Sequence, residues 1–213
     1  MYKTIQLGKI KTSRTELVDI AKALLVLSLA FTFVFSNTTL LNGTLFSRIT
    51  MPSFWLMFLI SLFTAGIGFL LHELSHKFVA QKYGCVAEFR AFDQMLFLAL
   101  GLAVFIGFIF AAPGAVMISG MITRKENGVI SAAGPMMNYV LGMVFLGLLL
   151  SVPTSSSFLT QVFAIGFQIN LWLGLFNMIP FGNLDGYKIF QWNRYVWLAM
   201  AAFGVYFIFF FLK

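Results

Sequence analysis

Two histidines stand four residues apart in the segment Gly68–Ala80, which reads GFLLHELSHKFVA. They are His72 and His76, the only histidines among 213 residues, and Glu73 directly follows the first. Side chains four apart share one face of a helix, so both imidazoles can reach a single metal ion. Glu73 lies about 100° further around the helix axis, beside that metal. The pattern H-E-x-x-H predicts zinc hydrolase chemistry, with two nitrogen ligands and a carboxylate that takes a proton from water.

A packing role for the histidines is the alternative interpretation. A histidine in an apolar helix can hydrogen-bond to a neighbouring helix. That role explains neither the spacing of four nor the presence of Glu73, because an ionisable residue in an apolar segment is costly and usually functional. We therefore favour the metal site.

A catalytic zinc site takes three protein ligands and leaves one position open. With no further histidine and a single cysteine, Cys85, we expect the third ligand to be a carboxylate. The candidates are Glu16, Asp19, Glu88, Asp93, Glu126 and Asp185. Asp185 is favoured because Pro180 and Gly182 break the preceding helix, and irregular backbone within a membrane is costly unless it lines a site. An ordinary helix-exit turn is the alternative.

The elements that must position these residues are membrane helices. The chain is 60% hydrophobic and 10% charged, whereas soluble domains carry about 25% charged residues. Its apolar runs approach the roughly 20 residues that cross a bilayer as a helix. The runs are at about 20–35, 54–80, 95–120, 128–150, 158–179 and 195–212. We predict an all-α polytopic membrane protein with about five to six transmembrane helices, a re-entrant or hairpin element and a zinc site within the membrane.

The net charge of +7 does not indicate nucleic-acid binding, because Lys and Arg gather at the ends of apolar runs, where they orient helices in the bilayer. Near the N-terminus, residues 2–10 alternate in polarity and predict a short strand at the membrane surface. Ser13 with Glu16 three residues later predicts a capping box that opens the first helix.

The apolar run 95–120 is interrupted by Pro113 and can be a span or a hairpin. If it does not cross and the N-terminus is inside, twelve of the fourteen basic residues lie inside, leaving Arg48 and Lys213 outside. If it crosses, the split is nine to five. The positive-inside rule favours the hairpin. Only the hairpin puts Asp185 on the same side of the membrane as the two histidines.

HELSH, together with Asn177, Pro180 and Leu184-Asp185-Gly186 in the pattern N-x-x-P-x-x-x-L-D-G, resembles the site-2 protease family of intramembrane zinc metalloproteases. The segment AAGPMMNY (132–139) is similar to that family's G-P-x-x-N motif. The resemblance covers a little over half of the chain.

The resemblance implies one zinc ion per chain, held by His72, His76 and Asp185, with Glu73 as general base. It also implies that Asn177, and with it Asn138, binds the substrate backbone or stabilises the oxyanion. Substrates are then transmembrane helices of other proteins, cleaved within or near the membrane.

Residues 111–120 resemble a family segment that runs extended near the site, where an edge can pair with an unwound substrate; a helix break with a linker is the alternative. We expect one integral-membrane domain over 1–213, with a catalytic core at about 54–186 and no soluble regulatory domain. We expect it in a prokaryotic cell membrane, with the N-terminus and the active-site opening on the cytoplasmic side.

Two other functions are compatible with the sequence. A membrane metal transporter would need ligands at more than one depth, whereas the spans offer one cluster near one face. A catalytically silent relative could act as a binding factor, although no site residue looks altered. The sequence leaves the oligomeric state open.

Overall fold

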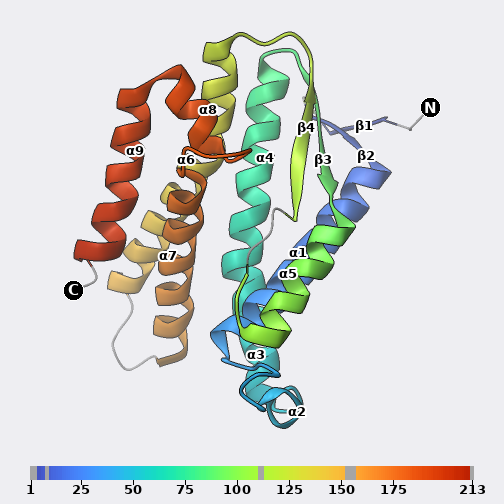
Figure 1. Ribbon diagram of the computed structural model, residues 1–213, viewed down its shortest axis with the longest axis vertical. Helices are drawn as coiled ribbons and strands as arrows, with labels where there is room; N and C mark the ends of the chain where they lie inside the picture. Colours follow the sequence, from blue (N-terminus) through green and yellow to red (C-terminus); the bar gives the residue numbers. More distant parts are fainter. Residues whose placement is uncertain (1–3, 8–9, 110–112, 152–156, 212–213) are drawn as a thin grey trace. The chain divides into compact units, whose positions relative to one another are not determined.

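The computed structural model describes residues 4–7, 10–109, 113–151 and 157–211 (Figure 1). Within these residues, five helical segments are long and apolar enough to cross a membrane. They are Arg14–Phe35, Pro52–Lys82, Arg124–Ser151, Phe158–Asn177 and Arg194–Phe211. The protein is therefore an all-α polytopic membrane protein, and its described strands form two small two-stranded sheets.

The chain divides into two compact units, one comprising 1–70 and 88–117 and the other 71–87 and 118–213. The boundaries between the two units fall within the helix that carries HELSH, between residues 70 and 71, and within two strands, between residues 87 and 88 and between residues 117 and 118. The prediction of one domain over 1–213 stays a prediction.

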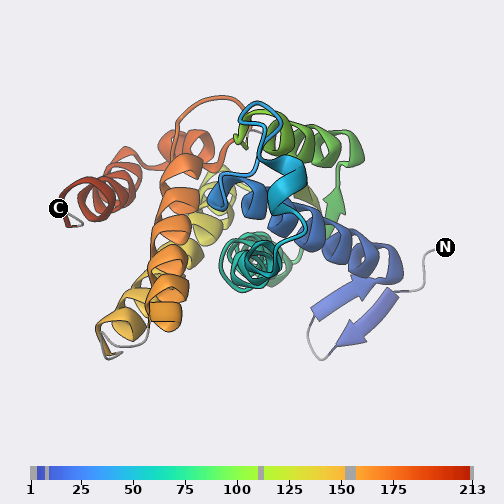
Figure 2. The ribbon, with the colours of Figure 1, turned by 90° about the horizontal axis from the view of Figure 1, so that it is seen from below.

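The first unit is built on α1, which packs against α3, η1 and α5; Figure 2 shows α5 running alongside α1. Two apolar clusters hold it together, one around Leu27 and Phe89 and the other around Phe33 and Phe54. Its elements are β1 (Thr4–Leu7), β2 (Ile10–Ser13), α1 (Arg14–Phe35), α2 (Leu45–Arg48), α3 (Pro52–Ser61), the π-helical η1 (Leu62–Gly66), the start of α4 (Ile67–Lys82), most of β3 (Val86–Ala91), α5 (Asp93–Ile106) and most of β4 (Gly114–Ser119).

The predicted single strand over residues 2–10 is corrected by the structure. β1 and β2 form an antiparallel hairpin, in which Thr4 pairs with Ser13 and Leu7 with Ile10; residues 2–3 and 8–9 lie outside the described residues. A lone strand would leave its backbone N–H and C=O groups unpaired, and the hairpin satisfies them.

The predicted cap of the first helix is confirmed in part. The Ser13 hydroxyl accepts a hydrogen bond from the Glu16 N–H at 3.1 Å. The fully buried Glu16 carboxylate accepts hydrogen bonds from the Thr12 hydroxyl at 2.7 Å and the Phe89 N–H at 2.9 Å. Glu16 therefore ties α1 to both strand pairs.

The segment that contains the apolar run 95–120 folds back on itself. The Phe92 N–H donates to the Pro113 carbonyl at 2.9 Å, which joins the two ends of the excursion. α5 has 14 residues, or about 21 Å, which is shorter than a bilayer core of about 30 Å. It ends at Gly107 in the left-handed conformation, with φ +72°. β4, which pairs with β3, makes the return, so the extended backbone predicted for 111–120 is confirmed for 114–119; residues 111–112 are outside the described ranges.

The second unit consists of the rest of α4, α6 (Arg124–Ser151), α7 (Ser157–Asn177), α8 (Asp185–Trp192), α9 (Arg194–Tyr206) and the π-helical η2 (Phe207–Phe211). Both α7 and α8 pack against α6 (Figure 1). Glycines let the helices approach closely, as is usual in membranes: a Cβ on Gly142 would lie 3.2 Å from Leu171, and Gly174 faces the Tyr139 ring. The core contains Tyr139, Leu146, Phe167, Leu171, Met178, Ile189 and Met200.

We expect Gly66→Ala to destabilise the first unit. A Cβ at Gly66 in η1 would collide with the Ser28 hydroxyl of α1 and lie 3.0 Å from the Leu24 side chain. Overpacking of this kind costs about 1–3 kcal/mol, read as a lower unfolding temperature in detergent. Gly101→Ala is the matched control, because nothing lies within 4 Å of its Cβ position; an equal fall in both variants would contradict this account.

Candidate metal centre

α4 carries both histidines on one face. The Nε2 atoms of His72 and His76 are 3.0 Å apart, and both residues are buried. This is the arrangement expected for side chains four residues apart on a helix.

The carboxylate of Asp185 completes the cluster from a distant part of the chain. Its Oδ2 lies 3.2 Å from the Nε2 of His72 and 3.1 Å from that of His76. Asp185 itself is buried. Among the described residues, these three form the group of His, Cys, Asp and Glu side chains able to hold a metal ion.

Asp185 is positioned by a break between two helices. α7 ends at Asn177 and α8 begins at Asp185, with Gly182 between them at φ +62°. A Cβ at Gly186 would collide with the Met178 carbonyl, so only glycine lets α8 start against this irregular backbone. The same carbonyl accepts a hydrogen bond from the Trp197 indole N–H at 2.7 Å. The predicted break at Pro180 and Gly182 is confirmed.

The hydrogen bonds of the other ring nitrogens fix which atoms face the cluster. The Nδ1 of His76 is 2.8 Å from the Ile130 main-chain carbonyl, and that of His72 is 2.6 Å from the Oδ1 of Asn138. Both oxygens accept, so each Nδ1 carries a proton, and the Nε2 of each ring, once deprotonated, turns a lone pair inward. Two lone pairs and a carboxylate oxygen then converge, an arrangement that suits a cation.

The donor set fits zinc. Two imidazole nitrogens and one carboxylate oxygen are a known ligand set of catalytic zinc. Ligand atoms of a tetrahedral site with bonds of about 2.0–2.1 Å are about 3.3 Å apart, close to the 3.0–3.2 Å found here. A second hydrogen bond from the other ring nitrogen to a main-chain carbonyl, as His76 makes with Ile130, is also typical of zinc-binding histidines.

Comparison with known proteins agrees with this chemistry. The chain is 38% identical over 190 residues to a Methanocaldococcus jannaschii protein named "Putative zinc metalloprotease MJ0611", covering 89% of this chain and 90% of that protein. It is 31% identical over 150 residues to "Putative zinc metalloprotease YwhC" of Bacillus subtilis, covering 60% and 66%. It is 28% identical over 138 residues to "Zinc metalloprotease MJ0392" of Methanocaldococcus jannaschii, covering 65% and 34%. No family model and no solved structure matches the chain. The chain belongs to this family of zinc metalloproteases.

Zinc is accordingly the metal of this metalloprotease, and His72, His76 and Asp185 form the group that can hold it. The electrostatics of the third ligand suit that role. Burial alone would raise the pKa of Asp185, but the charge of His76 when its ring is protonated, and hydrogen bonds with both imidazoles, lower its pKa below the usual range. A metal cation in the same place acts in the same direction and keeps the carboxyl group ionised.

The other carboxylates considered as third ligands have different partners. Glu16 accepts hydrogen bonds from Thr12 and Phe89. Asp19 and Asp93 both pair with Lys22, and Glu88 pairs with Arg90. Glu126 forms a reciprocal capping box with Thr123 at the start of α6, accepting its N–H at 2.7 Å. Each has a structural explanation that does not involve a metal.

α6 encloses the three candidate ligands without supplying one. A Cβ at Gly134 would lie 2.6 Å from the Nε2 of His72 and nearer still to that of His76. Pro135 is the next residue of the helix; it lacks the N–H that would bond the Ser131 carbonyl, one residue after the Ile130 carbonyl that contacts His76. The sequence indicated Gly134 and Pro135 only as parts of a motif; their place beside the two histidines was found only in the structure.

Three further residues were predicted from the sequence to belong to the site. Glu73 is buried on α4 and interacts electrostatically with His76. Asn177 ends α7, and its side-chain amide donates to the Leu173 carbonyl at 2.9 Å. Asn138 is fully buried and contacts His72, a position that favours orienting this histidine over binding substrate.

Asn170 was not predicted from the sequence as a site residue. Its side-chain oxygen accepts a hydrogen bond from the Asn138 amide at 3.2 Å, which connects it to the partner of His72. The sequence offered one signal for it, namely that Asn170 is an amide residue inside the apolar run 158–179.

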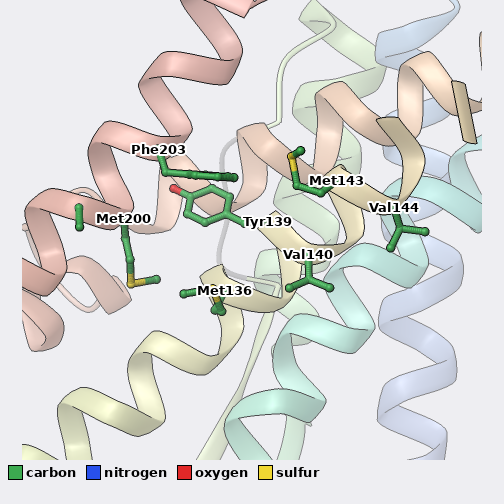
Figure 3. A pocket seen from close by; sticks show the side chains of 8 residues that line it. Met136, Tyr139, Val140, Met143, Val144, Met200 and Phe203 are labelled. Carbon is green, nitrogen blue, oxygen red and sulfur yellow. The ribbon is translucent and has the colours of Figure 1, made fainter. Parts of the chain in front are cut away.

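An apolar groove lies between α6 and α9, with a volume of about 540 Å³ (Figure 3). It begins at Met136, two residues after Gly134, and follows α6 through Val140 and Val144, all three of which are exposed. The other lining residues are Tyr139, Met143, Ala199, Met200 and Phe203. At 100° per residue, Met136, Val140 and Val144 lie on the side of α6 away from Gly134, so the groove and the candidate ligands occupy opposite faces of this helix.

We expect Gly134→Ala to abolish zinc binding, because the added Cβ occupies the space next to both Nε2 atoms. Metal analysis of the purified protein measures this, with one zinc per chain in the unaltered protein and loss in His72→Ala as the reference. Gly147→Ala on the same helix is the matched control, since nothing lies within 4 Å of its Cβ position. Full zinc content in Gly134→Ala would contradict the geometry described here.

Proposed function

We propose that this zinc metalloprotease belongs to the site-2 protease type and hydrolyses peptide bonds within or near the transmembrane helices of membrane proteins. One observation supports this proposal above all. The two histidines of H-E-x-x-H lie in the candidate span Pro52–Lys82, and Asp185 approaches both within 3.2 Å. A hydrolytic zinc site on a membrane-spanning helix acts on peptide bonds presented there.

Each site residue has a proposed part in the reaction. Bound zinc supplies a Lewis acid that activates water and polarises the scissile carbonyl. Glu73, buried beside His76, takes the proton of the attacking water and later delivers it to the departing amine. Asn177, at the end of α7, binds the substrate backbone or stabilises the oxyanion. Ile130 and Asn138 hold the two histidines in the tautomer that leaves Nε2 unprotonated.

The proposed substrate is a transmembrane helix with a weakly helical stretch. A helical carbonyl is already hydrogen-bonded within its own helix, so the scissile segment must unwind before attack. The apolar groove between α6 and α9, on the side of α6 away from the candidate ligands, is the surface that we assign to the part that stays helical, because it is lined by apolar residues. Three of its residues are methionines, which adapt to different partner shapes.

We place the protein in a prokaryotic cell membrane, with the N-terminus and the active-site opening on the cytoplasmic side. The relatives come from archaea and bacteria. The orientation is inferred from the charge distribution: with five spans and the hairpin formed by α5, twelve of the fourteen basic residues lie inside. Both the end of α4 and the start of α8 then face the cytoplasm.

We expect Glu73→Gln to reduce cleavage of a model transmembrane substrate by about 10²–10⁴-fold, the usual contribution of a general base. Zinc content stays at one per chain, because Glu73 is outside the ligand group. Gel-based cleavage in liposomes measures the rate, and Glu126→Gln, which alters an exposed cap, is the control. Cleavage at the normal rate by Glu73→Gln would falsify the mechanism.

The same preparation separates this function from the two others. A transporter would move zinc into liposomes, and that flux would survive Asp185→Ala. A silent binding factor would bind zinc through His72 and His76 yet leave every transmembrane substrate intact. Substrate cleavage that disappears together with zinc in Asp185→Ala is the result expected of a protease.

We expect a large side chain in the groove to separate two kinds of substrate. Val140→Trp fills the groove without touching the zinc ligands, so cleavage of a transmembrane substrate falls while cleavage of a short soluble peptide is retained. Leu198→Trp is the control, because Leu198 is an exposed residue of α9 that does not line the groove. Equal effects on both substrates would show that the groove does not bind the helix.

A further inference from the structure

Asn170 is a polar residue at the centre of α7, in the candidate span Phe158–Asn177, and its side chain is fully buried. It touches none of the proposed zinc ligands directly. A buried amide within a membrane helix is costly unless its hydrogen-bonding groups are satisfied. Its partners show what the side chain does.

A chain of hydrogen bonds runs from α7 to the metal centre. The Nδ2 of Asn170 donates to the Gly166 carbonyl at 2.9 Å. The Nδ2 of Asn138 donates to the Oδ1 of Asn170 at 3.2 Å. The Oδ1 of Asn138 then lies 2.6 Å from the Nδ1 of His72. Three side chains from three helices are thus linked in one line.

The direction of this chain is set at its far end. The Gly166 carbonyl can only accept a hydrogen bond, so the amide nitrogen of Asn170 must face it and the oxygen must face Asn138. Asn138 then presents its nitrogen to Asn170 and its oxygen to His72. The Nδ1 of His72 has to be the protonated nitrogen, which leaves Nε2 free to bind zinc.

The two histidines differ in the kind of acceptor that their Nδ1 proton faces. The Nδ1 of His76 faces the main-chain carbonyl of Ile130, an acceptor that cannot reverse. The partner of His72 is a side-chain amide, and an amide can turn over and offer its N–H₂ group instead. The orientation of the Asn138 amide must therefore be fixed by another hydrogen bond.

We propose that Asn170 is a positioning residue of the zinc site: through Asn138, it holds His72 in the tautomer and orientation that bind the metal. The proposal rests on the proposed ligand set. With Asn170 in place, reversal of Asn138 would bring two acceptors face to face at Asn170 and set an N–H₂ group against the protonated Nδ1 of His72. Without Asn170, the amide of Asn138 can reverse and the Nε2 of His72 can become protonated.

The decisive variant is Asn170→Leu, which keeps the side-chain volume and removes both hydrogen bonds. We expect its zinc affinity, measured by competition with a chelator, to fall about 10–100-fold, as is usual when an outer partner of a zinc ligand is lost. Thr32→Val is the matched control: Thr32 is also fully buried in a span and donates to the carbonyl four residues earlier, at 2.7 Å. Its zinc affinity stays unchanged.

Rescue distinguishes positioning from packing. In the double variant Asn138→Asp with Asn170→Leu, a carboxylate can only accept, so the tautomer of His72 no longer depends on Asn170. We expect this variant to regain most of the affinity lost in Asn170→Leu. If Asn170 only packed α7 against α6, the second change would restore nothing, and that result would overturn the proposal.

The ring nitrogens give a direct readout. The chain has two histidines, so protein labelled with ¹⁵N-histidine gives four ring-nitrogen signals. We expect Asn170→Leu to alter the protonated Nδ1 signal of His72 and to leave that of His76 in place.

Unchanged signals and affinity in Asn170→Leu would refute the role of this hydrogen-bond chain, whereas absence of zinc binding in the unaltered protein would refute the ligand set itself. Should Asn170→Leu not fold, Asn170→Ser, which is too short to reach Asn138, takes its place.

Discussion

The convergence of three electron-pair donors on one point governs the second unit of this protein. Two imidazole nitrogens and a carboxylate oxygen lie 3.0–3.2 Å apart with their lone pairs directed inward. Without a cation these groups repel one another, and low dielectric surroundings strengthen that repulsion. The helices that carry them must therefore be held in place by contacts of their own, and bound zinc converts the repulsion into attraction.

α6 provides much of that restraint, although it supplies no ligand. Its Ile130 carbonyl and Asn138 amide orient one histidine each, and Gly134 leaves the space that both rings occupy. α8 packs on the same helix, where Gly128 lies against Trp192 and Arg124 donates to Gln191 at 2.7 Å. The ligand from α8 and the ligands from α4 are thus positioned against one common element. A zinc metalloprotease of this kind needs α6 as much as it needs the ligands.

Membrane surroundings explain why the polar groups near the metal form hydrogen-bonded sets. Lipid offers no partners to an amide or a carbonyl, so unsatisfied groups are expensive. The Asn138–Asn170 pair meets this demand and at the same time gives its hydrogen bonds a fixed direction. In the first unit, the buried Glu16 is satisfied in the same manner by a hydroxyl and a backbone N–H. These hydrogen-bonded groups fix geometry, which is the property that a catalytic site requires.

The sequence alone determined the features that local backbone geometry imposes. A spacing of four puts His72 and His76 on one helix face, and Pro180 with Gly182 must interrupt α7, because both are properties of the backbone that hold in any fold. It favoured Asp185 among six carboxylates, but it could not bring that carboxylate within reach of the histidines, since ligation depends on distances between segments more than a hundred residues apart. Nor could it show that the run 95–120 returns on itself, because hydropathy does not report the hydrogen bond between Phe92 and Pro113. The partner of Asn170 was likewise decided only by the tertiary structure, since an amide in an apolar run signals that a partner exists but not which helix provides it.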